Sequence, residues 1–229
     1  MLQLNCQQDG LNVGRLSFNQ SLWRPRLKAK PTLVSITSNS YSDNDAITSY
    51  ISDVYRDYYD ATIAVQYPKL ACLKDGNGQF LAAVGFRPAA VKPLFLEQYL
   101  GSPIEQILQI PRNHVVEIGN LASKDEGASI YLFAALATYL NHLGFDKAAV
   151  TCTGFLEKRF RYLGLNPQKI AMANPNLLLQ DGENWGSYYQ TNPYVLVGSI
   201  KQACQRLQKI LKAEYQTHMP LTVIDSFQS

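Results

Sequence analysis

A single carboxylate in a hydrophobic segment is the residue best placed to do chemistry. Glu117 stands between Val116 and Ile118 in a run that is typical of a strand. Burial in such a strand would raise its pKa towards neutrality. A carboxylate of this kind can act as the general base for a substrate ammonium. It can equally be paired with a core arginine or lysine, and the sequence leaves both interpretations open.

Small residues follow this strand, at the expected start of a helix. They are Gly127, Ala128 and Ser129. Backbone N–H groups at a helix N-terminus attract anions, so this position suits the pyrophosphate or phosphopantetheine arm of a donor molecule. Such a segment is also commonly only a helix cap. The order of strand carboxylate, short loop, helix and second strand is more specific than either feature alone.

The elements that must position these residues are mixed strands and helices. We expect strands at 70–74, 79–86, 115–121, 147–152 and 194–199, and helices from residue 46 and over 94–100, 103–108, 127–143, 155–163 and 200–215. Asp43 or Asn44 can cap the first helix, with Ile47, Ile51, Val54, Tyr55 and Tyr58 on its inner face. Residues 174–193 are expected to be irregular. This order predicts one α/β (α+β layered) domain, a mixed twisted sheet flanked by helices.

We expect the chain to consist of three parts that differ in their content of regular secondary structure. Residues 1–45 form an irregular, basic segment that packs on the core, 46–199 form the core, and 200–229 form an amphipathic helix and tail. The first part contains the basic cluster of Arg24, Arg26, Lys28 and Lys30. That cluster could steer an acidic carrier protein or the phosphates of CoA, or be an ordinary solvated surface.

The segment around Glu117 resembles the acyl-donor half of the GNAT superfamily of N-acetyltransferases. The superfamily motif is Gln or Arg, two residues, Gly, one residue, then Gly or Ala, and Lys124, Gly127 and Ser129 occupy those places. The superfamily often has a tyrosine general acid four residues before the glycine of a later Leu-Gly-Phe. Here that spacing from Gly164 falls on Phe160, so the tyrosine role is not supported at this position.

A longer resemblance, from about Tyr58 to Gly198, is to the thermostable hemolysin family. It rests on four strings: Gly85-Phe86-Arg87-Pro88-Ala89, Leu94-Phe95-Leu96-Glu97-Gln98-Tyr99-Leu100, Val116-Glu117-Ile118-Gly119-Asn120-Leu121-Ala122 and Trp185-Gly186-Ser187-Tyr188-Tyr189. That family is similar to the autoinducer (acyl-homoserine lactone) synthases, which take acyl chains from acyl-carrier protein or CoA. The Ser-Arg that follows the strand carboxylate in those enzymes corresponds to Gly119-Asn120 here.

The resemblance implies an N-acyltransferase that moves an acyl group from acyl-CoA or acyl-carrier protein to a small amine such as an amino acid. It implies no metal and no permanently bound cofactor. The site residues it implies are catalytic Glu117 and Asn120, donor-binding Lys124, Gly127, Ala128 and Ser129, and a substrate pocket of Arg87, Phe95, Trp185, Tyr188 and Tyr189. The aromatic residues of this pocket could equally be core side chains.

The family name also suggests a membrane-active haemolysin or cytolysin. The expected C-terminal helix carries Lys201, Arg206, Lys209 and Lys212, so it could lie on an anionic membrane or dock an acidic carrier protein. The plainer interpretation is an ordinary surface helix. The start of the chain has no basic and apolar pattern of a signal peptide, and the uncharged stretch 127–145 is more typical of a buried helix than of a membrane span.

Net charge and cysteine spacing exclude further classes of function. The 21 Lys and Arg against 18 Asp and Glu leave a net charge of +3, which does not indicate a nucleic-acid partner. Cys6, Cys72, Cys152 and Cys204 lack zinc-ligand spacing, so we expect free thiols in a reducing, cytoplasmic compartment. Of the two function classes, the sequence favours the enzyme.

Overall fold

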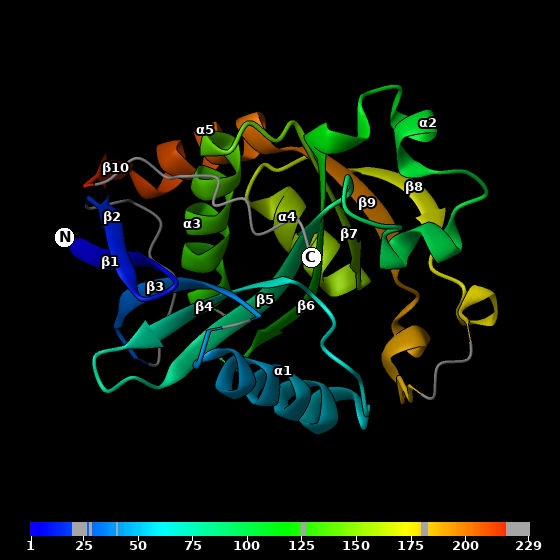
Figure 1. Cartoon of the computed structure of the whole chain (residues 1–229), viewed down its shortest axis with the longest axis horizontal. Coiled ribbons are helices and arrows are strands. Elements are labelled where there is room, and N and C mark those ends of the chain that lie inside the picture. The colour runs from blue at the N-terminus through cyan, green and yellow to red at the C-terminus, as the bar shows by residue number, and fades with distance from the viewer. Residues whose placement is uncertain (20–26, 28, 40, 125–126, 180–182, 219–229) are drawn as a thin grey trace.

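A ten-stranded mixed sheet forms the centre of the computed structural model (Figure 1). The structure describes residues 1–19, 27, 29–39, 41–124, 127–179 and 183–218. In the order β10-β2-β1-β3-β4-β5-β6-β7-β9-β8, most neighbours are antiparallel, whereas β1–β3 and β6–β7 are parallel. The strands are β1 Leu2–Gln8, β2 Leu11–Phe18, β3 Pro31–Ser38, β4 Lys69–Asp75, β5 Phe80–Pro88, β6 Val115–Ser123, β7 Lys147–Cys152, β8 Gln168–Met172, β9 Tyr194–Ser199 and β10 Ala213–Thr217.

Helices cover both faces of this sheet. They are α1 Asn44–Tyr59, α2 Ile104–Leu108, α3 Ala128–His142, α4 Gly154–Tyr162 and α5 Ile200–Leu211, with 3-10 turns η1 Phe95–Tyr99, η2 Arg112–His114, η3 Pro175–Leu177 and η4 Tyr188–Thr191. One hydrophobic cluster joins α3 and α5 to strands β1 to β5, and a second joins α1 to the opposite face. The predicted α/β layered fold with a mixed twisted sheet is confirmed.

Alternation along the strands decides which residues each helix meets. On β4, Leu70 and Cys72 pack towards α1, whereas Ala71 and Leu73 pack towards α3. A third cluster places η1 and α2 over β6, β7 and β9, with Ala149 of β7 among its buried members. The helix α1 and the η1–α2 segment therefore flank one region of the sheet.

A bulge in β6 lies in that region. Gly85 of β5 pairs with Gly119, but Ala83 pairs with Ala122, so β6 has one residue more than β5 over this stretch. Asn120 in the bulge has φ 51, in the left-handed region. On its other side, β6 pairs in parallel with β7 only as far as Ile118 and Val150. Asn120 is therefore paired with neither neighbouring strand.

The N-terminal part differs from the expectation of an irregular segment. Three strands, β1, β2 and β3, occupy much of residues 2–38 and extend the sheet. Of the basic cluster, Lys30 is exposed, while Arg24, Arg26 and Lys28 lie outside the described residues. The expectation missed a local signal, because Asp9-Gly10, with both residues at positive φ, is the turn of a hairpin between β1 and β2. The strand β10, by contrast, pairs with β2 from the far end of the described chain.

Smaller corrections concern single elements. The edge strand β8 was not expected, and α5 ends at Leu211, because Lys212 has φ 48 and the chain turns into β10. Tyr58 was placed on the inner face of α1, but it is 61% exposed. The other expected strands and helices are present within a few residues of the predicted bounds.

The apolar face of α5 is covered by the protein itself. Its buried residues, Ile200, Cys204, Leu207 and Leu211, include three that belong to the cluster shared with α3. Arg206 on the outer side donates from Nε to the carbonyl oxygen of Leu163 at 2.9 Å. In the described part of the chain, no helix has both the length and the apolar character needed to cross a bilayer.

Candidate active site

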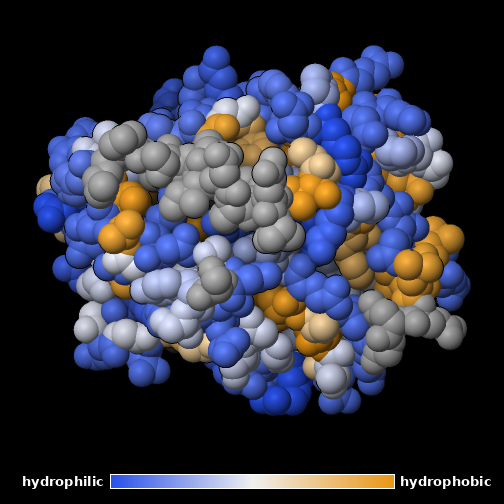
Figure 2. Space-filling view, in the orientation of Figure 1, coloured by the Kyte–Doolittle hydropathy of each residue, from blue (hydrophilic) through white to orange (hydrophobic). Residues whose placement is uncertain are grey.

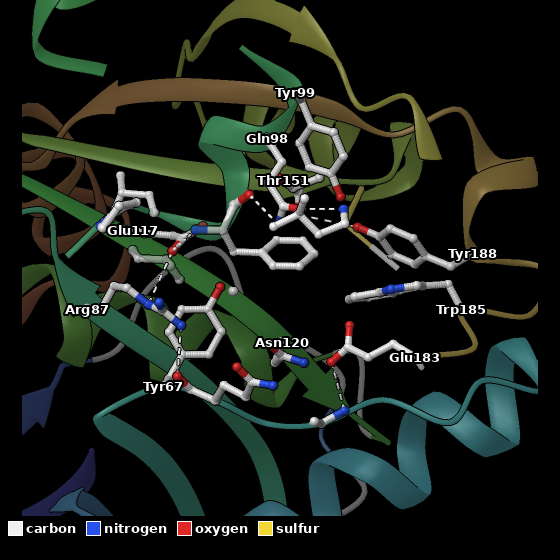
Figure 3. Close-up of a pocket in the computed structure, with 18 of the residues that line it drawn as sticks. Tyr67, Arg87, Gln98, Tyr99, Glu117, Asn120, Thr151, Glu183, Trp185 and Tyr188 are labelled. Atoms are coloured by element: carbon white, nitrogen blue, oxygen red, sulfur yellow. Dashed lines mark hydrogen bonds and ion pairs between the residues drawn. The ribbon is translucent and has the colours of Figure 1, made fainter. Parts of the chain in front are cut away.

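A cavity of about 320 Å³ opens beside the β6 bulge. Its floor is the stretch of β6 from Glu117 to Asn120, and its walls come from the region around Tyr67, from η1 and from residues 183–189 (Figure 3). It lies between α1 and the η1–α2 segment, beside the cross-strand pair of Gly85 and Gly119. At this volume it is in the range of sites for small ligands.

Glu117 is the buried acid of this cavity, with 1% of its surface exposed. Its Oε2 accepts from the backbone N–H of Phe95 at 3.1 Å, and its Oε1 accepts from that of Leu96 at 2.8 Å. These are the first N–H groups of η1, so the carboxylate also fixes that turn. Burial raises the pKa of Glu117, and the Arg87 guanidinium and the two N–H groups oppose this rise.

Arg87 is the cationic partner in the same cavity. Its Nε lies 3.4 Å from Oε2 of Glu117, and its Nη2 donates to the carbonyl oxygen of Gln66 at 2.8 Å. The guanidinium stacks over the ring of Tyr67 at 4.7 Å from the ring centroid. Glu117 therefore has features of both interpretations. It lines a cavity, as a general base would, and it has an arginine beside it, as a structural ion pair would.

Tyr67 is a central residue of the site that the sequence did not indicate. Its ring lies across the two glycines of β5 and β6. A Cβ at Gly85 would stand 2.5 Å from ring atoms of Tyr67, and a Cβ at Gly119 would stand 1.9 Å from its hydroxyl oxygen. Each residue at these two positions must therefore be a glycine for the ring to lie there. Isolated glycines within strands were the available signal for such a close approach.

Aromatic side chains form the wall opposite Glu117. Trp185, Tyr188 and Tyr189 contact one another with ring centroids 5.3–5.8 Å apart, and Trp185 also contacts Phe95 at 5.7 Å. The hydroxyls of Tyr99 and Tyr189 lie 2.5 Å apart. The expected aromatic pocket residues thus come together in one wall, whereas Arg87 lies beside Glu117, and Tyr188 in this wall is also a core residue, 6% exposed.

Residues 183–189 form a strap that is anchored to the end of α1. Thr62 and Asn184 exchange backbone hydrogen bonds, and Ser187 N–H donates to the carbonyl oxygen of Tyr59 at 2.8 Å. Gly186 has φ 51, and a Cβ there would stand 2.0 Å from the same oxygen. Glu183 accepts from the backbone N–H of Ala64 at 3.0 Å. The strap is therefore held at several points around the cavity.

Among the buried polar atoms of the cavity, Nε1 of Trp185 and Oγ1 of Thr151 have no hydrogen-bond partner within the described residues. Such atoms are uncommon in native proteins, and in a cavity they point to a ligand atom that satisfies them. An indole N–H is only a donor, so its partner must be an acceptor such as an oxygen.

The expected donor-binding residues lie apart from this cavity. Gly127, Ala128 and Ser129 are buried at the start of α3, which follows β6, and neither they nor Lys124 line the cavity. Nζ of Lys124 forms an ion pair with Oδ2 of Asp57 at 3.0 Å, and its backbone N–H donates to the hydroxyl of Tyr50. The structure therefore assembles Glu117, Asn120 and the aromatic pocket, with the α3 N-terminus beyond the bulge.

The mouth of the cavity is apolar on one side. Leu179 lines the cavity and is 76% exposed, and its N–H donates to Oε1 of Gln98. Leu177 and Met172, also exposed, belong to η3 and β8 next in the chain. Apolar surface also gathers at the end of the molecule where β8 lies (Figure 2). No three metal-ligating side chains meet anywhere within the described ranges.

A family model described as Thermostable hemolysin matches residues 37–204. No curated protein matches the chain at a significant level.

Several solved structures share the fold. A CoA-dependent acyl-homoserine lactone synthase, BjaI, with SAM and isopentyl-CoA, has TM-score 0.55 at 11% identity, covering 78% of this chain and 89% of that one. TofI, in a ternary complex with an inhibitor and MTA, has TM-score 0.54 at 16% identity, covering 76% and 96%. FeeM, an N-acyl amino acid synthase from uncultured soil microbes, has TM-score 0.53 at 12% identity, covering 80% and 96%.

Proposed function

The chain belongs to the thermostable hemolysin family, and from this premise we propose that it is an N-acyltransferase. It moves an acyl group from acyl-CoA or acyl-carrier protein to a small amine. The observation that carries the proposal is the buried Glu117 beside the bulge at Asn120, in a cavity where β6 and β7 separate. The names of the similar structures, lactone synthases and an N-acyl amino acid synthase, support this class of reaction.

In this proposal the donor lies along the gap between β6 and β7. Its phosphates or pantetheine arm interact with N–H groups at the start of α3, around Gly127, Ala128 and Ser129. The thioester carbonyl lies at Asn120, whose backbone is paired with neither neighbouring strand. The acyl chain extends towards the apolar mouth at Leu179.

The acceptor occupies the aromatic cavity in this arrangement. Glu117, directly or through a water molecule, takes a proton from the acceptor ammonium, and the neutral amine attacks the thioester carbonyl. Backbone donors at the bulge stabilise the developing oxyanion. Nε1 of Trp185 and Oγ1 of Thr151 support an acceptor with a polar oxygen, such as the carboxylate of an amino acid. The reaction releases the free thiol.

The test combines donor binding with turnover. A donor at about 100 times its Kd stabilises the folded state by about 2.7 kcal/mol, which would raise the Tm by roughly 5–11 °C for a chain of this size. Acyl-CoA of several chain lengths and an acyl-carrier protein are compared with free CoA. Thiol release is then measured with pairs of amino acids and the amines that lack their carboxylate. No change in Tm and no amine-dependent thiol release with any donor would contradict the proposal.

A further inference from the structure

Three parts of the chain hold the ring of Tyr67 in place. Tyr67 belongs to the segment between α1 and β4, its ring crosses the glycine pair, and the Arg87 guanidinium covers one face of it. Only 6% of its surface is exposed. The ring therefore has one location, and its hydroxyl is held above the backbone of Gly119, the residue directly before Asn120.

The hydroxyl of Tyr67 faces the cavity without a partner. Figure 3 shows it directed into the space between Arg87, Glu117 and Asn120. Among the residues that the structure describes, none forms a hydrogen bond with this hydroxyl. The hydroxyl is accessible from the cavity, so a molecule bound there can accept its hydrogen bond.

The protonation state of Tyr67 makes it a donor. Burial raises its pKa well above the usual value of 10, and the nearby charge of Glu117 raises it further, while Arg87 lowers it. The phenol therefore keeps its proton at neutral pH. A neutral, buried hydroxyl that is fixed before the substrate arrives is suited to stabilise a charge that develops on a substrate oxygen.

We propose that Tyr67 is a catalytic residue whose hydroxyl donates a hydrogen bond to the thioester carbonyl oxygen of the donor. This inference rests on the proposed acyl transfer. When the amine nitrogen bonds to the carbonyl carbon, the C=O π pair moves to the oxygen, between the Tyr67 hydroxyl and the bulge. The C=O bond then re-forms, the C–S bond breaks, and the thiol sulfur leaves with the electron pair. Glu117 holds the proton taken from the ammonium, the second proton lost by the amine nitrogen passes to the leaving sulfur, directly or through water, and Tyr67 keeps its own.

The first experiment is the kinetics of Tyr67→Phe, which keeps the ring over the glycines. We expect kcat to fall about 10²- to 10³-fold, the usual effect of removing one oxyanion donor, with the KM of the donor nearly unchanged. The matched control is Tyr139→Phe, a tyrosine of similar burial, 7% exposed, in the core on the α3 side. It should keep normal turnover.

An activated donor separates the two roles that a tyrosine could have. A thiophenol thioester has a good leaving group that needs no protonation. If Tyr67 acts on the carbonyl oxygen, the loss in Tyr67→Phe persists with this donor. If the loss disappears, Tyr67 acts on the leaving sulfur and the assignment is overturned. Equal kcat in the wild type and in Tyr67→Phe with both donors would also overturn it.

A second measurement needs no turnover. An acyl-CoA analogue with a methylene inserted between sulfur and carbonyl is an unreactive ketone, and its carbonyl carbon can be labelled with ¹³C. We expect the bound carbonyl resonance of the wild type to lie downfield of that in Tyr67→Phe. Equal positions in both proteins would contradict the Tyr67 assignment alone. Failure of the analogue to bind the wild type would contradict the proposed function instead.

Discussion

Arg87 and Glu117 are directly opposed partners on β5 and β6, and their side chains form the ion pair on the cavity floor. The arginine does not cancel the effect of burial, since the pKa of Glu117 remains raised. Relative to water, the folded environment therefore favours the protonated carboxyl of Glu117. A structural role and a catalytic role consequently predict different results for the same substitutions.

Glu117→Gln removes the charge and keeps the shape. We expect turnover to fall ~10²- to 10⁴-fold, because the amide cannot accept the proton, with donor binding nearly unchanged. Some loss of Tm is expected as well, because the NH2 group of glutamine cannot accept the backbone N–H hydrogen bond that one of the two carboxylate oxygens accepts. The matched control is Glu157→Gln, a glutamate 9% exposed that pairs with Arg161 and Lys169 away from the cavity. It should keep its turnover. Normal turnover and a much lower Tm in Glu117→Gln would mean that Glu117 is structural.

The pH dependence of kcat/KM follows from the pKa of Glu117. An ordinary glutamate titrates near 4.5, and burial places the acid limb of kcat/KM above that pH. Arg87→Gln removes a charge that lowers this pKa, so its acid limb should move to still higher pH. For stability, the contribution of Glu117 is fully present below its unfolded pKa and is lost as pH rises through its folded pKa. An acid limb that stays in place in Arg87→Gln would exclude Glu117 as the titrating group.

Gly119→Ala tests the glycine floor. The added Cβ would stand 1.9 Å from the Tyr67 hydroxyl, so the ring must move. We expect a loss of about 1–3 kcal/mol in the free energy of unfolding, as for other overpacked sites. Gly198→Ala is the control, because Gly198 is also in a strand but has no atom within 4 Å of an added Cβ. Denaturant unfolding of both variants provides the comparison, and equal losses would show that Tyr67 does not need this glycine.

Gly186→Ala tests the strap around the cavity. Both Gly186 and Gly144 have positive φ, but only at Gly186 does the new Cβ meet a backbone atom, the Tyr59 carbonyl oxygen at 2.0 Å. We expect Gly186→Ala to raise the KM of the acceptor several-fold more than Gly144→Ala, with donor binding unchanged in both. Steady-state kinetics at saturating donor measures this. An identical acceptor KM in the two variants would indicate that the strap does not shape the acceptor site.

The membrane-active alternative is tested by dye leakage from anionic liposomes. The apolar face of α5 is buried against the core, so this helix offers the bilayer only its charged side. We expect no leakage from micromolar protein in the absence of thioester and amine. Leakage that disappears when Lys201, Arg206, Lys209 and Lys212 are neutralised would support the membrane-active function instead.

Elements with strong local patterns were predictable. The turn at Asp75-Gly76-Asn77-Gly78 indicated the β4–β5 hairpin, and Gly144 indicated the end of α3. Asp9-Gly10 is likewise the signal of a hairpin turn, between β1 and β2, and it was missed. The strand β10 was not predictable, because its partner β2 is remote in sequence.

Some residues of the candidate site were predictable from the sequence and others were not. Glu117 was predictable because a carboxylate between Val116 and Ile118 is conspicuous in a strand. The bulge at Asn120 depends on register, which the sequence of one strand does not reveal. Tyr67 belongs to no motif, and only the glycines opposite it carried a signal.

The strand β10 has a consequence for how the chain reaches its final form. It pairs with β2, and Tyr215 donates from its hydroxyl to the carbonyl oxygen of Val13, 202 positions away. Loop closure over such a separation is slow and entropically costly. During synthesis, β2 therefore emerges long before its neighbour and presents an open edge to other chains. The nascent N-terminal hairpin is thus open to pairing with other chains until β10 has been made.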